Sequence, residues 1–221
     1  MALMGAFARA RRPLTPEEVS GVTSVWRARG MLAVLVAVAA AFGAWSLLLP
    51  VVPTAVLDAG GAESLAGLST GVFMLFTVIT QIFTPWLLRK FGFRVVMVVS
   101  AFLLGGPAFG YMLGMEPGVL LTVSAIRGVG FGALSVAEAA IIAELVPLRL
   151  LGRATGTLGL FVGASQMVAL PLGLGLVDVV GYNGVFAIGA SVGLVALFSA
   201  VLIPTIPPSV EEHITPNVIR V

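Results

Sequence analysis

The 221-residue sequence contains no cysteine, a single histidine and few charged residues. Without cysteine, the chain can hold neither a disulfide framework nor a thiolate metal site. Charged residues make up only 10% of the chain and hydrophobic residues 59%, and the mean hydropathy is +1.11. Because a soluble domain needs a polar surface, this composition excludes an ordinary soluble fold and indicates an integral membrane protein.

The sequence also lacks the features of nucleic-acid-binding proteins and of common enzymes. No basic stripe occurs outside short loops, so we expect no nucleic-acid partner. The stretch GASVG at 189–193 matches a nucleophile motif, but that motif follows a strand and needs a histidine base. Here it lies in an apolar run, and the only histidine is His213, near the C-terminus. Since no carboxylate pair, histidine cluster or phosphate loop occurs, we expect no enzyme, no cofactor and no metal site.

Six apolar stretches are long enough to cross a membrane. A hydrocarbon core of about 30 Å requires about 20 apolar residues in a helix. The stretches lie at residues 30–53, 67–88, 95–114, 118–146, 154–177 and 183–203. The short alternating segments of an outer-membrane barrel do not occur. The sequence therefore predicts an all-α membrane protein with six transmembrane helices.

Polar segments flank the predicted bundle at 30–203. Residues 1–29 carry five arginines but no apolar stretch of the kind found in a cleavable signal. In this segment Thr15 is placed to cap a helix, Pro16 suits its first position, and Glu18 suits its third. We expect a short cytoplasmic helix that leads into the first span, with an ordinary tail as the alternative. Residues 204–221 are expected to form a cytoplasmic tail or the start of a linker.

The basic residues are distributed unevenly among the connections between spans. The loops at 89–94 and 149–153 contain five of the twelve Lys and Arg residues, and the N-terminal segment contains five more. The other three connections contain no basic residue and hold four acidic ones: Asp58, Glu63, Glu116 and Asp178. The positive-inside rule therefore places both termini in the cytoplasm. An even number of spans agrees with this orientation.

The fourth apolar stretch carries two charges at depths where charge is costly. Arg127 lies about 8 Å to the outer side of its midpoint, and Glu138 about 9 Å to the cytoplasmic side. Their spacing of about three turns puts both on one face, but about 16 Å apart, too far for an ion pair. Charges inside a membrane commonly face a cavity and mark a transport pathway. The alternative is an arginine that only joins helices through backbone carbonyls.

Small residues repeat along two of the predicted spans. In the fourth they are Gly128, Gly132, Ser135 and Ala139, and in the fifth Gly156, Gly159 and Gly163. Small residues at this spacing let helix backbones approach closely. We expect both stripes to pack against neighbouring helices.

Several short motifs resemble signatures of the major facilitator superfamily. They are PWLLRKFGFR at 85–94, RGVGFG at 127–132, AELVP at 143–147 followed by GRA at 152–154, and GYNGVF at 181–186. The resemblance implies that residues 30–203 form one half of that fold, built from two inverted three-helix repeats. The family fold needs two such halves around a central cavity. We therefore expect an N-terminal half whose partner is a C-terminal half or a second copy of the chain. A fragment, a split gene product and a dimerising subunit remain the alternatives.

The predicted gate departs from the family pattern. The loop signature at 85–94 normally carries an aspartate, whose place Arg89 takes here. Because the family's inner gate rests partly on that aspartate, the resemblance implies a different network in this chain. We expect Glu144 to pair with one of three loop arginines: Arg89, Arg94 or Arg153. The fifth span keeps only part of the antiporter pattern, and the first span has no acidic residue.

In the family fold, the first, second, fourth and fifth spans line the cavity. The expected substrate or coupling residues on these spans are Arg127, Glu138, Gln81, Gln166 and Trp45. Arg127 carries a permanent charge and would hold an anionic group, whereas Glu138 could carry a proton. Alternatively, Trp45 packs or faces lipid, and the two glutamines only bond between helices. Mostly apolar and aromatic walls favour an amphipathic or hydrophobic solute over a sugar.

Together these features predict a multi-pass protein of the bacterial inner membrane. We expect the N-terminal half of a secondary transporter that moves a small solute by alternating access, with proton-coupled efflux as one form. The alternative is a truncated or non-transporting membrane subunit or scaffold. The expected partners are the lipid bilayer, a small-molecule solute and a second six-helix half.

Overall fold

The computed structural model describes residues 14–205, and nearly all of this stretch is helical. The elements are α2 (Pro16–Ser20), the 3₁₀ helix η1 (Val25–Arg27), α3 (Met31–Asp58), α4 (Glu63–Phe91), α5 (Phe93–Gly105), the 3₁₀ helix η2 (Gly106–Leu113), α6 (Pro117–Leu145) and α7 (Leu148–Val201). No strand occurs between residues 14 and 205, so the all-α prediction is confirmed there. Parts of the predicted flanking segments, 1–13 and 206–221, lie outside the described residues.

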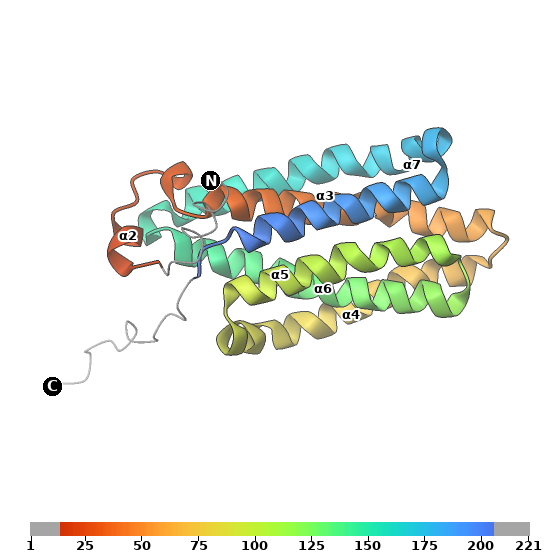
Figure 1. Cartoon of the computed structure of the whole chain (residues 1–221), viewed down its shortest axis with the longest axis horizontal. Helices are drawn as coiled ribbons and strands as arrows, with labels where there is room; N and C mark the ends of the chain where they lie inside the picture. The colour runs from red at the N-terminus through yellow and green to blue at the C-terminus, as the bar shows by residue number, and fades with distance from the viewer. Residues whose placement is uncertain (1–13, 206–221) are drawn as a thin grey trace, which may run out of the picture.

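Five helices of this stretch are long and apolar enough to cross a membrane: α3, α4, α5 continued by η2, α6 and α7. The last of them, α7, consists of two helical segments that meet at Gly181, where φ is 70° and ψ is 172°. Figure 1 shows that the chain reverses direction there, so the two segments of α7 run back along each other. Within residues 14–205 there are thus five or six apolar helices, depending on whether α7 is counted once or twice.

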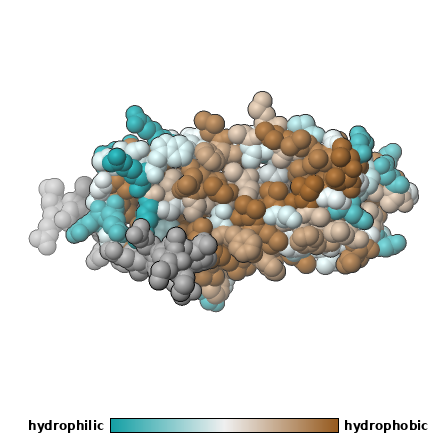
Figure 2. Space-filling view, turned by 45° about the horizontal axis from the view of Figure 1, so that its top comes forward, coloured by the Kyte–Doolittle hydropathy of each residue, from teal (hydrophilic) through white to brown (hydrophobic). Residues whose placement is uncertain are grey.

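The helices form an elongated bundle (Figure 1). α3 packs mainly against α7, α4 packs against α6, and α5 contacts both α6 and α7. The backbone N–H of Leu14 donates to the carbonyl of Thr205 at 3.1 Å, so the two ends of the described chain lie together. At the opposite end of the bundle, the Tyr182 hydroxyl donates to Asp58 at 2.6 Å. Figure 2 shows hydrophilic residues at both ends of one face and a broad hydrophobic band between them, as expected for a membrane-spanning bundle.

Two glycines of α6 bring it close to α4. A Cβ built on Gly128 would collide with the carbonyl oxygen of Phe73, and one on Gly132 with that of Thr77. Thr77 also donates its hydroxyl to the carbonyl of Gly128 at 3.2 Å. The predicted packing of this stripe is therefore confirmed, because only glycine leaves room for the α4 backbone.

The second glycine stripe does not pack within the described chain. A Cβ on Gly156, Gly159 or Gly163 would meet nothing within 4 Å among the described residues. In contrast, the glycines of the GASVG stretch do pack, since Gly193 lies against the backbone of Gly105 on α5. No helix of the described chain covers the fifth-span stripe, so its packing stays a prediction, because helical spacing alone does not say which face a neighbouring helix covers.

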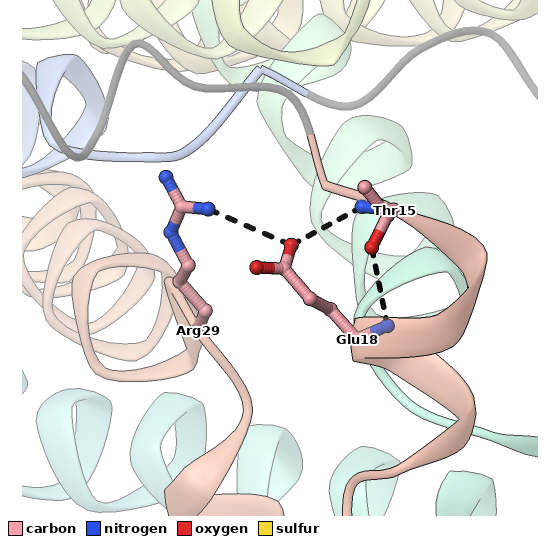
Figure 3. Close-up of polar contacts among 3 residues, drawn as sticks. All are labelled: Thr15, Glu18 and Arg29. Atoms are coloured by element: carbon pink, nitrogen blue, oxygen red, sulfur yellow. Dashed lines mark hydrogen bonds and ion pairs between the residues drawn. The ribbon is translucent and has the colours of Figure 1, made fainter.

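The short helix predicted before the first span is present as α2. Thr15 Oγ1 accepts a hydrogen bond from the backbone N–H of Glu18 at 3.3 Å, and Glu18 Oε2 accepts one from the N–H of Thr15 at 3.2 Å. The same carboxylate lies 3.7 Å from Arg29 Nη1 (Figure 3). These reciprocal bonds satisfy two free N–H groups at the helix start, which is why so short a helix forms.

Arg149 ties this N-terminal segment to the start of α7. Its Nη2 donates to the carbonyl of Val22 at 2.7 Å and to that of Ser20 at 3.3 Å. Beside this contact, the ring of Trp26 lies 6.3 Å from that of Phe161 on α7. The segment therefore covers part of the basic end of the bundle.

Candidate functional site

Arg127 lies in the middle of the bundle with only 3% of its surface exposed. Its Nε donates to the carbonyl of Leu104 on α5 at 3.0 Å, and its Nη1 to the hydroxyl of Tyr111 on η2 at 3.4 Å. That hydroxyl also shares a hydrogen bond with Ser124 at 3.0 Å. Part of the guanidinium thus joins α6 to α5 and η2, as expected for an arginine that joins helices. The remaining nitrogen, Nη2, is buried and has no hydrogen-bond partner among residues 14–205.

Arg127 lines a small pocket where α3, α4, η2 and α6 meet. Its lining includes Arg127, Tyr111, Trp45 and the hydroxyl residues Ser69 and Thr70. The Nε1 of Trp45 is also buried without a hydrogen-bond partner in the described part of the chain. Two residues that line this pocket therefore each hold a buried donor without a partner, and an unsatisfied buried donor carries a desolvation cost. The site is suited to a group that accepts hydrogen bonds.

The pocket is small. Its volume is about 20 Å³, which leaves room for about one water molecule. A larger ligand would need more space than this conformation of the pocket offers.

An aromatic cluster from three helices forms one wall beside the pocket. The ring of Trp45 stacks on Phe131 with centroids 4.6 Å apart, and the rings of Phe42 and Phe73 lie 5.1 and 5.7 Å from Phe131. Phe73 also lies under Arg127, with its centroid 5.9 Å from the guanidinium carbon. Phe131 was not among the predicted site residues, although its position four residues after Arg127 puts both on one helix face. Tyr111 had no comparable signal, because it comes from another element.

Glu138 is buried in α6 as well, with 8% of its surface exposed. Its Oε2 has no hydrogen-bond partner among the described residues. It does not line the pocket at Arg127, and the helical rise places the two residues about 16 Å apart along α6. The two buried charges therefore occupy separate positions in the bundle.

The two predicted glutamines lie away from the pocket. Gln81 donates from Nε2 to the Ser135 hydroxyl at 3.1 Å and so joins α4 to α6. This agrees with the alternative prediction that Gln81 only forms a bond between helices. Gln166 is half-buried on α7, and its side chain makes no hydrogen bond within residues 14–205.

The predicted gate pairing is not formed in this conformation. Glu144 is half-buried near the end of α6 and makes no ion pair with Arg89, Arg94 or Arg153 among the described residues. Arg94 instead donates to the carbonyl of Val201 at 2.7 Å and joins the start of α5 to the end of α7. Arg89 and Arg153 are exposed. The gate therefore stays a prediction for another conformation.

The sequence profile of the Major Facilitator Superfamily matches residues 34–217. The chain belongs to this superfamily, whose members are transporters, and its apolar helices make it an integral membrane protein. An uncharacterized MFS-type transporter of Mycobacterium tuberculosis (strain H37Rv) is 30% identical to it over 172 residues, which are 74% of this chain and 24% of the relative.

Two further relatives widen the comparison. The purine ribonucleoside efflux pump NepI of Escherichia coli (strain 536) is 26% identical over 161 residues, covering 72% of this chain and 41% of the pump. The crystal structure of a D-xylose–proton symporter superposes with a TM-score of 0.65 at 18% identity, over 82% of this chain and 49% of the symporter. The symporter supports the fold alone. This chain spans about a quarter of the mycobacterial transporter and two-fifths of the pump.

Proposed function

We propose that the chain is the N-terminal half of a secondary transporter that moves a small solute by alternating access. Membership of the superfamily and a match to about half of a symporter support this. The proposed unit has six spans in two inverted repeats, with both termini in the cytoplasm of a bacterial cell. The basic residues gathered at one end of the bundle support that orientation. A second six-helix half, from another part of a longer protein or a second copy, completes the cavity.

The observation that carries the proposal is the unpaired nitrogen of a buried arginine. An arginine that only joined helices would gain most by bonding every donor to the protein, yet Nη2 of Arg127, a residue that lines the pocket, is unpaired among the described residues. Trp45 lines the same pocket, and its indole N–H is likewise buried without a partner in the described part of the chain. We infer that these two donors bind an acceptor group of the solute, while the aromatic cluster contacts its apolar part. An amphipathic molecule with a carboxylate or carbonyl group fits both requirements.

Proton coupling is proposed to pass through Glu138. Arg127 cannot release a proton under physiological conditions, since the guanidinium stays charged. Glu138 is the one carboxylate buried within the described bundle, and one of its oxygens is without a partner. Intramembrane carboxylates of this kind serve as proton relays in many transporters.

Transport by proteoliposomes that contain both halves tests the site. Arg127→Ala and Arg127→Lys should each lower the uptake rate by about 10- to 100-fold, the range expected when a hydrogen bond to a charged group is lost. Both should insert normally, and Arg27→Gln, which removes an exposed charge elsewhere, should transport like the wild type. Glu138→Gln should remove the pH dependence of uptake while sparing exchange. Wild-type transport by Arg127→Ala would show that the arginine only joins helices.

The gate is tested separately with Glu144→Gln. We expect this change to shift the balance of inward- and outward-facing states, measured by accessibility of a single introduced cysteine, with little effect on folding. An exposed ion pair near the surface contributes only about 0–1 kcal/mol. If the variant yields no folded protein, Glu144 is structural and the gate assignment is wrong.

The second candidate function is a non-transporting membrane subunit or scaffold. The bonds of Arg127 to Leu104 and Tyr111 favour it, because they join α6 to α5 and η2 without any solute. In that case the chain would insert and fold but would move no solute in any pairing, and Arg127→Ala would change only its stability.

A further inference from the structure

An apolar groove lies where α4, α5 and α6 meet. Its volume is about 270 Å³. Phe91 of α4 and Val95 and Val99 of α5 line it, and each is 49% exposed, so the groove opens outward. Ala133 of α6 contributes to its lining as well. In a membrane this opening faces hydrocarbon, and only an apolar occupant can fill it without loss.

The longest wall of the groove, formed by α4, has about the length of one leaflet. Its α4 wall extends from Thr80 to Phe91, which is about 16 Å at about 1.5 Å per residue. Half of a hydrocarbon core of about 30 Å is about 15 Å. The Thr80 hydroxyl is already bonded to the carbonyl of Phe76 at 2.7 Å and presents no unpaired donor to an apolar occupant. An extended acyl chain therefore matches the α4 wall in length and the apolar lining in chemistry.

A cation lies at the end of the groove that is nearest the α4–α5 turn. Lys90 Nζ is 5.3 Å from the ring centroid of Phe91, itself a groove residue, and 4.7 Å from that of Trp86. No carboxylate pairs with Lys90 among residues 14–205. The surrounding stretch at 85–94 contains Arg89 and Arg94 but no acidic residue. The mouth of the groove is thus positive and suited to an anionic headgroup.

We propose that this groove binds one acyl chain of an anionic phospholipid from the leaflet at the basic end, with the phosphate held by Lys90. The apolar walls select the chain, and the ammonium selects the headgroup. Trp86, which is 49% exposed beside Lys90, lies where aromatic residues commonly meet the headgroup region. The site does not depend on transport, so its failure leaves the proposed function unaffected.

Native mass spectrometry of the full chain in detergent, titrated with phosphatidylglycerol and with phosphatidylcholine of identical acyl chains, tests the headgroup. The wild type should bind phosphatidylglycerol about fivefold more tightly, the effect expected of one basic residue near an anionic surface. Lys90→Gln should abolish this preference and keep the phosphatidylcholine affinity. Arg27→Gln removes one exposed charge outside the groove and should retain the preference. Equal affinities in the wild type, or an unchanged preference in Lys90→Gln, would overturn the proposal.

A second pair of variants tests the groove itself. Val99→Trp should fill it and weaken both lipids, whereas Val195→Trp, on α7 and also 49% exposed, should weaken neither. If both variants bind lipid alike, the groove is not the site. Because the chain has no cysteine, Val99→Cys introduces a single thiol at the groove, which can form a disulfide with a second copy of the chain bound there. If this variant forms a disulfide-linked dimer in membranes and the wild type shows no lipid adduct, the occupant of the groove is a second copy of the chain and not a lipid.

Discussion

The contact between α4 and α6 makes a quantitative prediction for Gly128. In Gly128→Ala, the new Cβ would fall well inside 3.0 Å of the Phe73 carbonyl oxygen, a separation that real Cβ atoms essentially never show. The obstacle is backbone, which cannot rotate away as a side chain would. Ordinary contact is restored only if the helices separate locally by roughly 1 Å.

The cost follows from three effects. Forcing a methyl group into a packed contact costs about 1–3 kcal/mol. The separation also stretches the hydrogen bond from Thr77 to the Gly128 carbonyl, which contributes about 0.5–1.5 kcal/mol. Against this, replacing a helical glycine by alanine gains at most about 1 kcal/mol. We expect a net destabilisation of about 1–3 kcal/mol.

Gly163→Ala is the matched control, because it lies inside a helix with nothing within 4 Å of the new methyl group. It should be as stable as the wild type or slightly more stable. Tryptophan fluorescence during thermal unfolding in detergent can rank the variants, since the chain has three tryptophans. Gly132→Ala should behave like Gly128→Ala, as it meets the Thr77 carbonyl. If Gly128→Ala and Gly132→Ala unfold at the same temperature as Gly163→Ala, the inferred close approach of α4 and α6 is wrong.

Three further predictions concern the basic end and the topology. Arg149→Gln should speed hydrogen exchange in α2, because it removes the bonds to two carbonyls of the N-terminal segment. Arg153→Gln should leave that exchange unchanged, because the exposed Arg153 side chain makes no such bond. Thr15→Ala should lower the stability of α2 by about 1 kcal/mol and speed hydrogen exchange in α2 alone. Hydrogen exchange as slow as in the wild type would show that the cap is unimportant. Cysteines at Ala62 and Leu148 should label oppositely with an impermeant reagent, with Ala62→Cys labelled from outside; labelling of Leu148→Cys in intact cells would reverse the proposed orientation.

The predicted site was only partly recoverable from the sequence. Arg127 and Glu138 stood out because charge in an apolar helix is costly, and both are indeed buried. Trp45 does line the pocket beside Arg127. Gln81, chosen for the same polarity, bonds to Ser135 instead. Polarity within a span shows that a residue needs a partner, but it does not show whether that partner is a ligand or another helix.

Local chemistry was enough to predict the helices of this protein. The apolar runs and the capping residues Thr15 and Glu18 each depend on a few neighbouring residues, so the chain itself shows that it is helical and about where its helices lie, although α3, α4 and α7 extend several residues beyond the predicted spans. Only the tertiary structure decided what Arg127 contacts, since Leu104 and Tyr111 come from other elements whose register no local pattern encodes. It likewise decided that the glycines of α6 are covered by α4 while those of the fifth span stay open. Burial depends on which faces meet, and that is a property of the whole bundle.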